Sequence, residues 1–283
     1  MARQPGWLRR VAGEIVRRLR QNDLMMMAAA ISYYWLLAFI PLLLLGTSAV
    51  GYLLGSSDQA VEEIMSAARR FIPRGTGPDV EQFLHTLIRT RHVTGGLGIG
   101  FLIWVAMGVF DIITTSLTLL TGSRETRSFF RRKLVALVLM CTVGFLLLVT
   151  LVGSWILAAW SNIEDLVGAT ISLPQFLTHP GFPLYLSTIL MAILLTIMYR
   201  IAPVREIRWP AAAAGAIIAA ALWQQARVLF NWYLTTYARY NLVYGILGGF
   251  IGLILWIFYT AIILLLGGML ADILDRGGHP PPA

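Results

Sequence analysis

Residues 243–271 read VYGILGGFIGLILWIFYTAIILLLGGMLA and contain no Asp, Glu, Lys, Arg or His. An α-helix rises about 1.5 Å per residue, so about 20 apolar residues cross the roughly 30 Å hydrocarbon layer of a bilayer. This stretch is longer than that minimum and is apolar on every face of a helix. We therefore predict that it forms a transmembrane helix.

The rest of the chain has a similar composition. Of its 283 residues, 58% are hydrophobic and 13% are charged, and the mean hydropathy is +0.73. Soluble domains are usually about 45–50% apolar and about 25% charged. Five further stretches have the apolar length of a span, at residues 24–54, 95–120, 134–160, 183–202 and 209–234. The sequence predicts an all-α integral membrane bundle of six transmembrane helices over residues 24–271, with a cytoplasmic tail over 272–283.

Basic residues are distributed unequally among the connections. Six arginines precede residue 24, five basic residues fall in 121–133 and three in 199–208, whereas residues 161–182 contain no Lys or Arg. Membrane insertion retains positively charged loops in the cytoplasm. We expect both termini on the cytoplasmic side. The net charge of +8 is then an orientation signal, and no nucleic-acid partner is expected.

Residues 1–23 form a separate cytoplasmic segment with helical periodicity. Its apolar face would carry Trp7, Leu8, Val11, Ile15 and Leu19, opposite Arg9, Arg10, Arg17, Arg18 and Arg20. Anionic lipid attracts each such arginine by about 1 kcal/mol, which favours an amphipathic helix lying on the cytoplasmic leaflet. The alternative is a helix that packs on the bundle.

The first connection outside the membrane, residues 55–94, is long and carries two amphipathic stretches. Pro73, Gly75, Gly77 and Pro78 separate them. Proline and glycine in such a cluster favour a turn. The pattern predicts an extracytoplasmic helical hairpin.

Two ionisable residues, Asp111 and Arg227, lie inside predicted spans. Each costs about 2.5–3.5 kcal/mol to insert, so such residues usually face the interior of a bundle and are functional candidates. Counted along their helices, the two differ in depth by roughly 15 Å, which exceeds the reach of an arginine side chain. The sequence therefore predicts two polar sites at different depths and no direct ion pair.

The candidate intramembrane polar site has an inner and an outer part. In the inner part, Asp111 matches the depth of hydroxyl-bearing side chains on the first span, Ser32, Tyr33 and Tyr34. Asp111 is either a structural carboxyl group held by these hydroxyls or a transport or proton-relay group. In the outer part, Gln224 and Asn231 lie near Arg227, which either extends toward the membrane surface or binds an anionic headgroup or substrate.

Proline and glycine positions predict how the helices pack. Pro41, in the middle of the first span, removes one backbone donor and favours a kink. Gly245, Gly248 and Gly252 place small residues on one face of the last span, and this spacing allows a second helix to approach closely. Internal packing is the ordinary explanation, and self-association is the alternative.

Residue types needed for catalysis are scarce. Cys141 is the only cysteine, and His85, His92, His179 and His279 show no metal-site spacing. No phosphate-cradling glycine motif occurs. We expect no metal, no cofactor and no enzymatic activity.

Residues 28–43, AAAISYYWLLAFIPLL, resemble the first-helix signature of the YihY/virulence factor BrkB family of bacterial inner-membrane proteins. The stretch 240–248, YNLVYGILG, and residues 264–268, LLLGG, are similar to the last two helices of that family. The resemblance covers nearly the whole chain. One difference concerns the acid that the family usually has soon after the glycine near the end of the last helix. This chain has Met269 there, and Asp272 follows three residues later.

The resemblance implies a multi-pass protein of the bacterial inner (plasma) membrane, and some members carry the label ribonuclease BN. Our leading hypothesis is a transporter or lipid-handling protein whose substrate the sequence does not specify. The alternative is a non-transporting scaffold or envelope assembly factor that binds a membrane-protein partner or a second copy of itself. A membrane-bound ribonuclease is third, because the cytoplasmic connections lack clusters of acids or histidines. Membrane lipids with anionic headgroups are the expected partners in every case.

Overall fold

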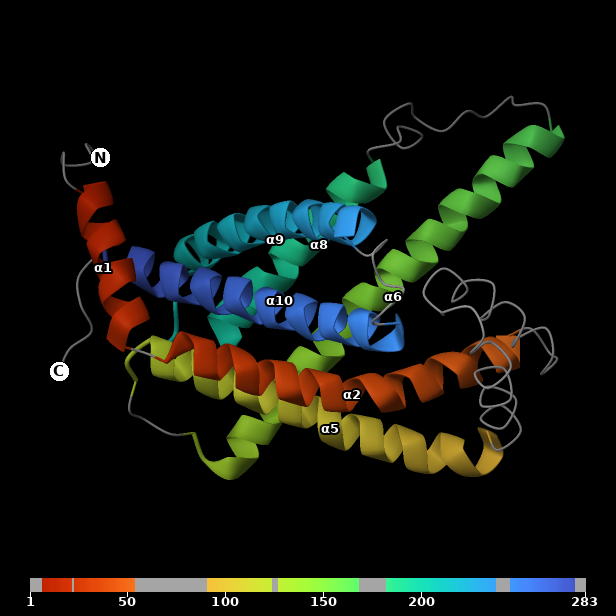
Figure 1. Ribbon diagram of the computed structural model, residues 1–283, viewed down its shortest axis with the longest axis horizontal. Helices are drawn as coiled ribbons and strands as arrows, with labels where there is room; N and C mark the ends of the chain where they lie inside the picture. Colours follow the sequence, from red (N-terminus) through yellow and green to blue (C-terminus); the bar gives the residue numbers. More distant parts are fainter. Residues whose placement is uncertain are drawn as a thin grey trace. The chain divides into compact units, whose positions relative to one another are not determined.

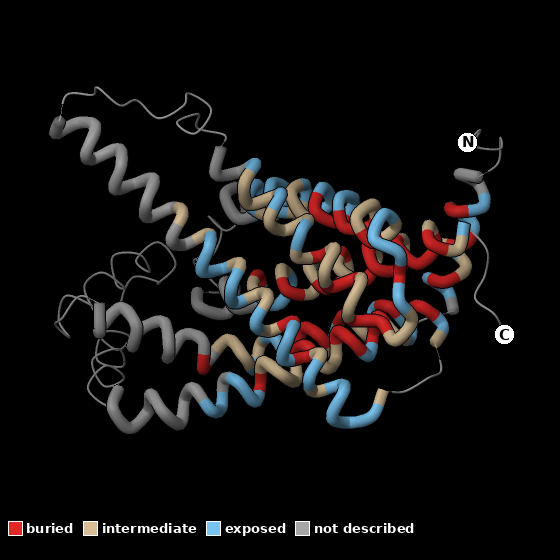
Figure 2. The backbone as a smooth tube through the Cα atoms, turned by 180° about the vertical axis from the view of Figure 1, so that it is seen from behind, coloured by how far each residue is buried: buried red, intermediate tan, exposed pale blue. Residues whose placement is uncertain are grey.

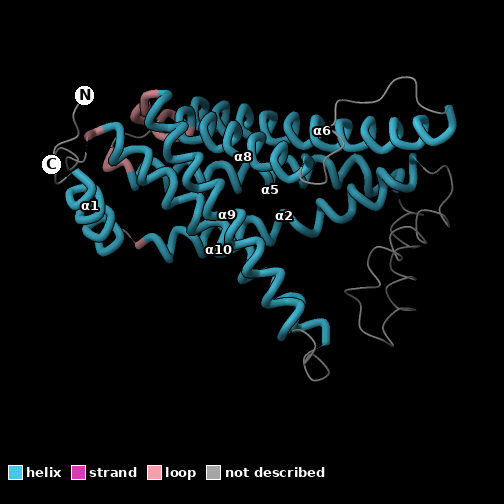
Figure 3. Tube along the Cα trace, turned by 90° about the horizontal axis from the view of Figure 1, so that it is seen from above, coloured by secondary structure: helices cyan, strands magenta, loops and turns pink. Residues whose placement is uncertain are grey.

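The computed structural model describes residues 7–21, 23–53, 91–123, 127–167, 182–237 and 245–277. Within these ranges the chain is helical apart from short connections, and no strand occurs (Figure 1, Figure 3). The all-α prediction is therefore confirmed for the described part of the chain. Residues 54–90, which include most of the expected hairpin, lie outside it.

Seven helices make up the described chain. They are α1 (Trp7–Gln21), α2 (Leu24–Leu53), α5 (Arg91–Leu120), α6 (Phe129–Val167), α8 (Phe182–Ile201), α9 (Trp209–Tyr237) and α10 (Gly245–Asp275). Each of the six apolar stretches found in the sequence corresponds to one helix from α2 to α10. The helices α5 and α6 begin several residues before the expected starts, and α10 continues past residue 271 to Asp275. Helical hydrogen bonding thus extends beyond the most apolar part of these stretches.

Four helices in the described part of the chain are long and apolar enough to cross a membrane. These segments are Ile103–Leu120, Phe129–Thr150, Trp209–Tyr233 and Ile251–Asp275. Shorter apolar helical segments occur in α2, over Leu24–Phe39, and in α8, over Tyr185–Ile201. The described residues therefore fit a multi-pass membrane protein, and six complete crossings remain a prediction.

The chain divides into two compact units. Unit 1 comprises Met1–Leu24, Ile113–Ala226 and Ile263–Ala283, and unit 2 comprises Met25–Ile112 and Arg227–Ile262. The unit boundaries fall inside α5, α9 and α10 rather than in loops. Most of the buried side chains in the described part of the chain belong to unit 1 (Figure 2).

Small residues allow the helices of unit 1 to pack closely. A Cβ atom at Gly215 of α9 would lie 2.6 Å from the carbonyl oxygen of Gly267 on α10. A Cβ atom at Gly267 would overlap the hydroxyl of Tyr199, which donates a hydrogen bond to the Leu264 carbonyl at 2.8 Å. Backbones can approach this closely only where a side chain is absent.

In unit 2, α2 packs against α5 through an aromatic ring. A Cβ atom at Gly108 would lie 3.0 Å from two carbon atoms of the Tyr34 ring. A second ring contact joins α9 and α10, where Phe230 and Trp256 have their centroids 4.8 Å apart. Aromatic side chains thus fill the helix contacts that glycine and alanine fill in unit 1.

The N-terminal helix α1 packs on the end of α10 (Figure 1). Val11 is buried with Met269 and Ile273 in one cluster, and Ile15 packs against it. This contact corresponds to the alternative that the sequence left open for residues 1–23, a helix that packs on the bundle. The expected orientation was wrong for one arginine, because Arg18 is 2% exposed while Leu19 is 41% exposed. The helix turns Arg18 inward because a carboxylate lies buried beneath it.

Candidate functional site

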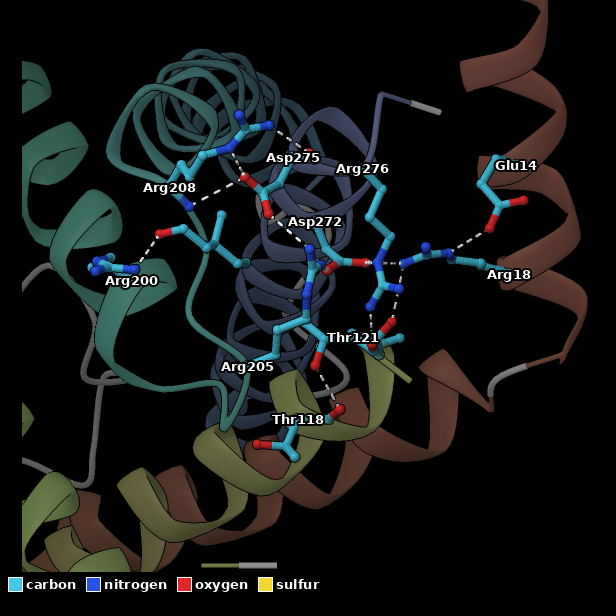
Figure 4. Close-up of polar contacts among 12 residues, drawn as sticks. Glu14, Arg18, Thr118, Thr121, Arg200, Arg205, Arg208, Asp272, Asp275 and Arg276 are labelled. Atoms are coloured by element: carbon cyan, nitrogen blue, oxygen red, sulfur yellow. Dashed lines mark hydrogen bonds and ion pairs between the residues drawn. The ribbon is translucent and has the colours of Figure 1, made fainter. Parts of the chain in front are cut away.

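The described structure gathers charged side chains around the end of α10. The contributing segments are α1, the end of α5, the connection between α8 and α9, and α10 itself, all within unit 1 (Figure 4). We name the set formed by Glu14, Arg18, Arg205, Arg208, Asp272, Asp275 and Arg276 the Asp272 cluster.

Asp272 is the centre of this cluster and is 0% exposed. Its Oδ2 accepts hydrogen bonds from Nη1 of Arg18 at 2.7 Å and from Nε of Arg276 at 2.9 Å. Its Oδ1 accepts a third bond from Nη1 of Arg205 at 2.5 Å. Three guanidinium groups from three parts of the chain thus share one carboxylate. Charge-assisted hydrogen bonds of this kind are roughly twice as strong as neutral ones.

Asp275, one helical turn further along, holds the connection between α8 and α9. Its carboxylate accepts bonds from Arg205 Nη2 at 2.9 Å and from Arg208 Nε at 2.7 Å. The Nη2 atom of Arg208 donates to the backbone carbonyl of Asp275 at 2.7 Å. Arg205 therefore bridges the two carboxylates of α10, and the basic connection is fixed at both of its arginines.

The end of α5 joins the cluster through its carbonyl groups. Gly122 has a φ of 64° and closes the helix, a conformation that glycine adopts without strain. The Leu120 carbonyl accepts a bond from Arg18 at 3.2 Å, and the Thr121 carbonyl accepts one from Arg276 at 2.6 Å. Cations are favourable at a helix C-terminus, where the last carbonyls lack helical partners.

On α1, Glu14 orients the arginine that enters the cluster. Its carboxylate accepts bonds from Arg17 Nη2 at 2.6 Å and from Arg18 Nε at 2.7 Å. The hydrogen bond from Arg17 lowers the pKa of Glu14 below its usual value of 4.5; burial opposes this shift and Arg18 adds to it. Glu14 therefore remains ionised and holds Arg18 in line with Asp272.

The polar residues predicted around Asp111 lie in unit 2. Asp111 is half-buried on α5. The Ser32 hydroxyl donates to the Ala28 carbonyl of its own helix at 2.7 Å. Tyr33 and Tyr34 are 61% and 38% exposed, and their rings form a T-shaped contact with an interplanar angle of 84°. Tyr34 reaches α5 at Gly108, about one turn before Asp111, and the role of the carboxyl group stays a prediction.

The outer part of the predicted polar site is divided between the two units. Gln224, in unit 1, donates a hydrogen bond to the Thr188 hydroxyl on α8. Arg227 and Asn231, in unit 2, are exposed on α9. The structure thus gives Gln224 a helix-packing contact, and a substrate role for the other two residues stays a prediction.

The proline and glycine residues that were predicted to shape helix packing are only partly described by the structure. Pro41 is buried, and α2 continues through it as one helix. Gly252 is buried on α10, whereas the surroundings of Gly245 and Gly248 lie outside the described side chains. The closest helix approaches in the described structure are instead at Gly215, Gly267 and Gly268.

Sequence reasoning missed the Asp272 cluster, because it assigned residues 272–283 to a tail. A signal was present in the charge pattern. Asp272 and Asp275 are spaced one turn apart at the end of an apolar helix, on the side of the membrane to which the basic connections were assigned. Carboxylates in such a position are expected to pair with those arginines.

Comparison with known proteins gives matches along nearly the whole chain. Residues 15–281 match the family described as Virulence factor BrkB. A Bacillus subtilis (strain 168) protein named as ribonuclease-like, YfkH, is 26% identical over 268 residues, which cover 93% of this chain and 94% of that protein. A UPF0761 membrane protein of Aggregatibacter aphrophilus is 27% identical over 262 residues, covering 91% and 89% of the two chains.

A UPF0761 membrane protein of Idiomarina loihiensis is 28% identical over 225 residues, covering 77% of this chain and 75% of that protein. No solved structure matches. The family match includes Arg18, the basic connection between α8 and α9, and both carboxylates of α10. The resemblance seen in the sequence is thereby confirmed, and the chain is a membrane protein of the BrkB family.

Proposed function

We propose that this protein moves or otherwise handles a solute or lipid in the bacterial inner membrane, with both termini in the cytoplasm. The Asp272 cluster holds one end of unit 1 in the arrangement described. The observation that carries the proposal is the complete burial of Asp272 among three guanidinium groups.

Stability alone does not explain such a cluster. Moving a charge out of water costs several kcal/mol, and well-packed apolar residues of similar volume often stabilise a protein as well or better. Here α1 already has an apolar contact with α10 through Val11 and Met269. The Nη2 atom of Arg18 is buried and has no hydrogen-bond partner in the described part of the chain, which is a further cost.

A cluster of this kind suits a contact that forms in one state and breaks in another. Switching proteins repack ion pairs when their elements rearrange. Arg18 and Arg205 come from segments that can leave α10 without breaking any transmembrane helix. Their release would expose Asp272 and Asp275 to water or to a ligand. We therefore propose that the Asp272 cluster is a gate, whose ion pairs break during transport.

Purified protein in liposomes tests this proposal. The probes are NBD-labelled phospholipids, followed by dithionite reduction, and a panel of entrapped small solutes. We expect wild-type protein to move at least one probe faster than protein-free liposomes do. Arg18→Gln removes the link from α1 to Asp272 and should change that rate several-fold.

Arg20→Gln is the matched control, because Arg20 is exposed on the same helix. It removes the same charge without touching the cluster, so the rate should stay at the wild-type value. The proposal is overturned if correctly inserted wild-type protein moves no probe, or if the two variants behave alike. A protein that moves nothing but captures neighbours on crosslinking in native membranes would instead be a scaffold. Ribonuclease chemistry forms no part of the proposal.

A further inference from the structure

Two connections at the end of unit 1 lie next to each other and form an exposed surface. Arg127, just before α6, donates to the carbonyls of Ile201, Ala202 and Pro203 at 3.1, 3.1 and 2.7 Å. These carbonyls belong to the last residue of α8 and to the two residues after it. The start of α6 and the connection leading into α9 are thereby held together.

Both connections contribute basic and aromatic side chains to this surface. We name it the basic-aromatic patch, and it consists of Phe129, Phe130, Arg131, Arg132, Arg200 and Trp209. Phe130 is 84% exposed, and the Arg200 guanidinium lies 5.8 Å from the centre of the Trp209 ring. Aromatic rings with cations beside them are typical of the boundary between headgroups and acyl chains.

Among the described residues of this surface, Arg127, Arg131, Arg132 and Arg200 outnumber the acids, of which Glu206 is the one present. Two helices, α6 and α9, begin here, and neither has an acid in its first turn. A helix N-terminus carries about half a positive charge, so Arg131 and Arg132 in the first turn of α6 add to a positive potential. Glu206 is paired with Arg200 at 2.7 Å.

The guanidinium of Arg127 lies close to these positive charges. Burial lowers the pKa of Arg127 below its usual value, the positive charge of Arg131 lowers it further, and the negative charge of Glu206 opposes the shift. Because Arg127 bonds backbone carbonyls, which carry no full charge, an added anion would relieve the repulsion. Negative groups at helix N-termini are favourable for the same reason.

We infer that the basic-aromatic patch binds phospholipids with a net negative headgroup at the cytoplasmic surface of the membrane. The phosphate and its charge lie against Arg131 and Arg132, while Phe129, Phe130 and Trp209 enter the layer beneath the headgroups. The inference rests on the proposed function for the orientation that places this end of unit 1 at the cytoplasmic surface. It does not require that the lipid be transported.

Thermal unfolding of the full chain in mixed micelles tests the inference. Protein in a neutral detergent is titrated with phosphatidylglycerol, with phosphatidylcholine of the same acyl chains, and with glycerol phosphate. A ligand that binds only the folded state raises the melting temperature, and the rise grows with the logarithm of the ligand concentration once that exceeds the dissociation constant. We expect phosphatidylglycerol to raise it at concentrations at which phosphatidylcholine and glycerol phosphate do not.

The double variant Arg131→Gln/Arg132→Gln should need at least about tenfold more phosphatidylglycerol for the same shift, since each arginine contributes about 1 kcal/mol near an anionic surface. The control, Arg131→Lys/Arg132→Lys, keeps both positive charges at the same positions and should need less than about twofold more. Equal shifts of the melting temperature with both phospholipids overturn the inference. A protein partner would then be the alternative occupant of the surface. An equal shift with glycerol phosphate shows a free-anion site, and equal behaviour of the two variants places the lipid elsewhere.

Discussion

The buried carboxylate of Asp272 in unit 1 and the hydroxyl groups of Ser32 and Thr260 in unit 2 are satisfied in different ways. In unit 1, Asp272 is held by arginines that are 254, 67 and 4 residues away in sequence. In unit 2, Ser32 and Thr260 each donate to a carbonyl four residues earlier in their own helix. The first arrangement joins distant segments, and the second joins nothing beyond one turn.

This difference indicates where the fold of each unit is determined. A hydroxyl bonded within its own helix leaves the position of neighbouring helices to packing alone. A buried carboxylate with three partners requires all of them to be present, since removing one leaves an uncompensated charge. We therefore expect substitutions to have large, long-range effects in unit 1 and small, local effects in unit 2.

The largest effect is expected from Asp272→Asn. Without the carboxylate charge, Arg18, Arg205 and Arg276 lose their shared partner, and only Glu14 and Asp275 remain beside them as opposing charges. The free energy of unfolding should therefore fall by about 3–5 kcal/mol. Ser32→Ala in unit 2 should change it by less than about 1 kcal/mol, because the lost hydrogen bond is offset by the helix propensity of alanine. SDS unfolding titrations of the detergent-solubilised variants measure both.

Glu206→Gln is the control for loss of one negative charge, since Glu206 is 76% exposed and exposed ion pairs contribute about 0–1 kcal/mol. Equal losses for Asp272→Asn and Glu206→Gln would show that the cluster does not stabilise unit 1. An equal loss for Ser32→Ala would remove the contrast between the units.

Adding one methyl group to a close helix contact should give an intermediate effect. In Gly215→Ala the new Cβ meets the backbone oxygen of Gly267 at 2.6 Å, which cannot rotate away, so we expect a loss of about 1–3 kcal/mol. In Gly108→Ala the neighbour is the Tyr34 ring at 3.0 Å. That ring is part of a partly exposed side chain that can shift, and the loss should be smaller.

Gly144→Ala on α6 provides the reference, because no atom lies within 4 Å of its Cβ position. It should leave stability unchanged or raise it by up to about 1 kcal/mol through helix propensity. If Gly215→Ala matched this reference in the same titration, the close contact between α9 and α10 would be refuted.

The smallest effect is expected from pH acting on Glu14. Its pKa is lower in the folded protein than the usual 4.5. The ionised carboxylate therefore contributes stability that is complete above pH 4.5 and is lost as pH falls through that value toward the folded pKa. Unfolding midpoints of wild-type protein and Glu14→Gln, measured from pH 7 to pH 3, should converge at the acid end. A constant difference would mean that Glu14 acts through its shape and not through its charge.

The helices were predictable because each depends on a local property. Residues 209–234 and 183–202 were placed from apolar length alone, and α9 and α8 begin at Trp209 and Phe182. The amphipathic period of residues 1–23 predicted α1 in the same way. Helix formation in an apolar medium satisfies every backbone group within the segment, so no knowledge of neighbours is needed.

The candidate site was less predictable. Asp111 attracted attention because it lies deep in an apolar stretch, whereas Asp272 was assigned to the tail by its position near the end of the chain. Arg18 was placed on the outer face of its helix because arginine usually prefers water. The expectations for Asp272 and Arg18 each considered one segment at a time. The burial of Asp272 depends on Arg18, and the burial of Arg18 depends on Asp272.

The sequence by itself determined that this chain is a helical membrane protein of the BrkB family, where its described apolar helices begin and end to within seven residues, and on which side its basic connections are expected. These follow from hydropathy and charge, which act over one helix length. Only the tertiary structure decided that Arg18, Arg205 and Arg276 share one buried carboxylate, and that Gly215 and Gly267 bring two backbones together. Such contacts join residues far apart in the chain, and their free energy exists only once the helices have packed.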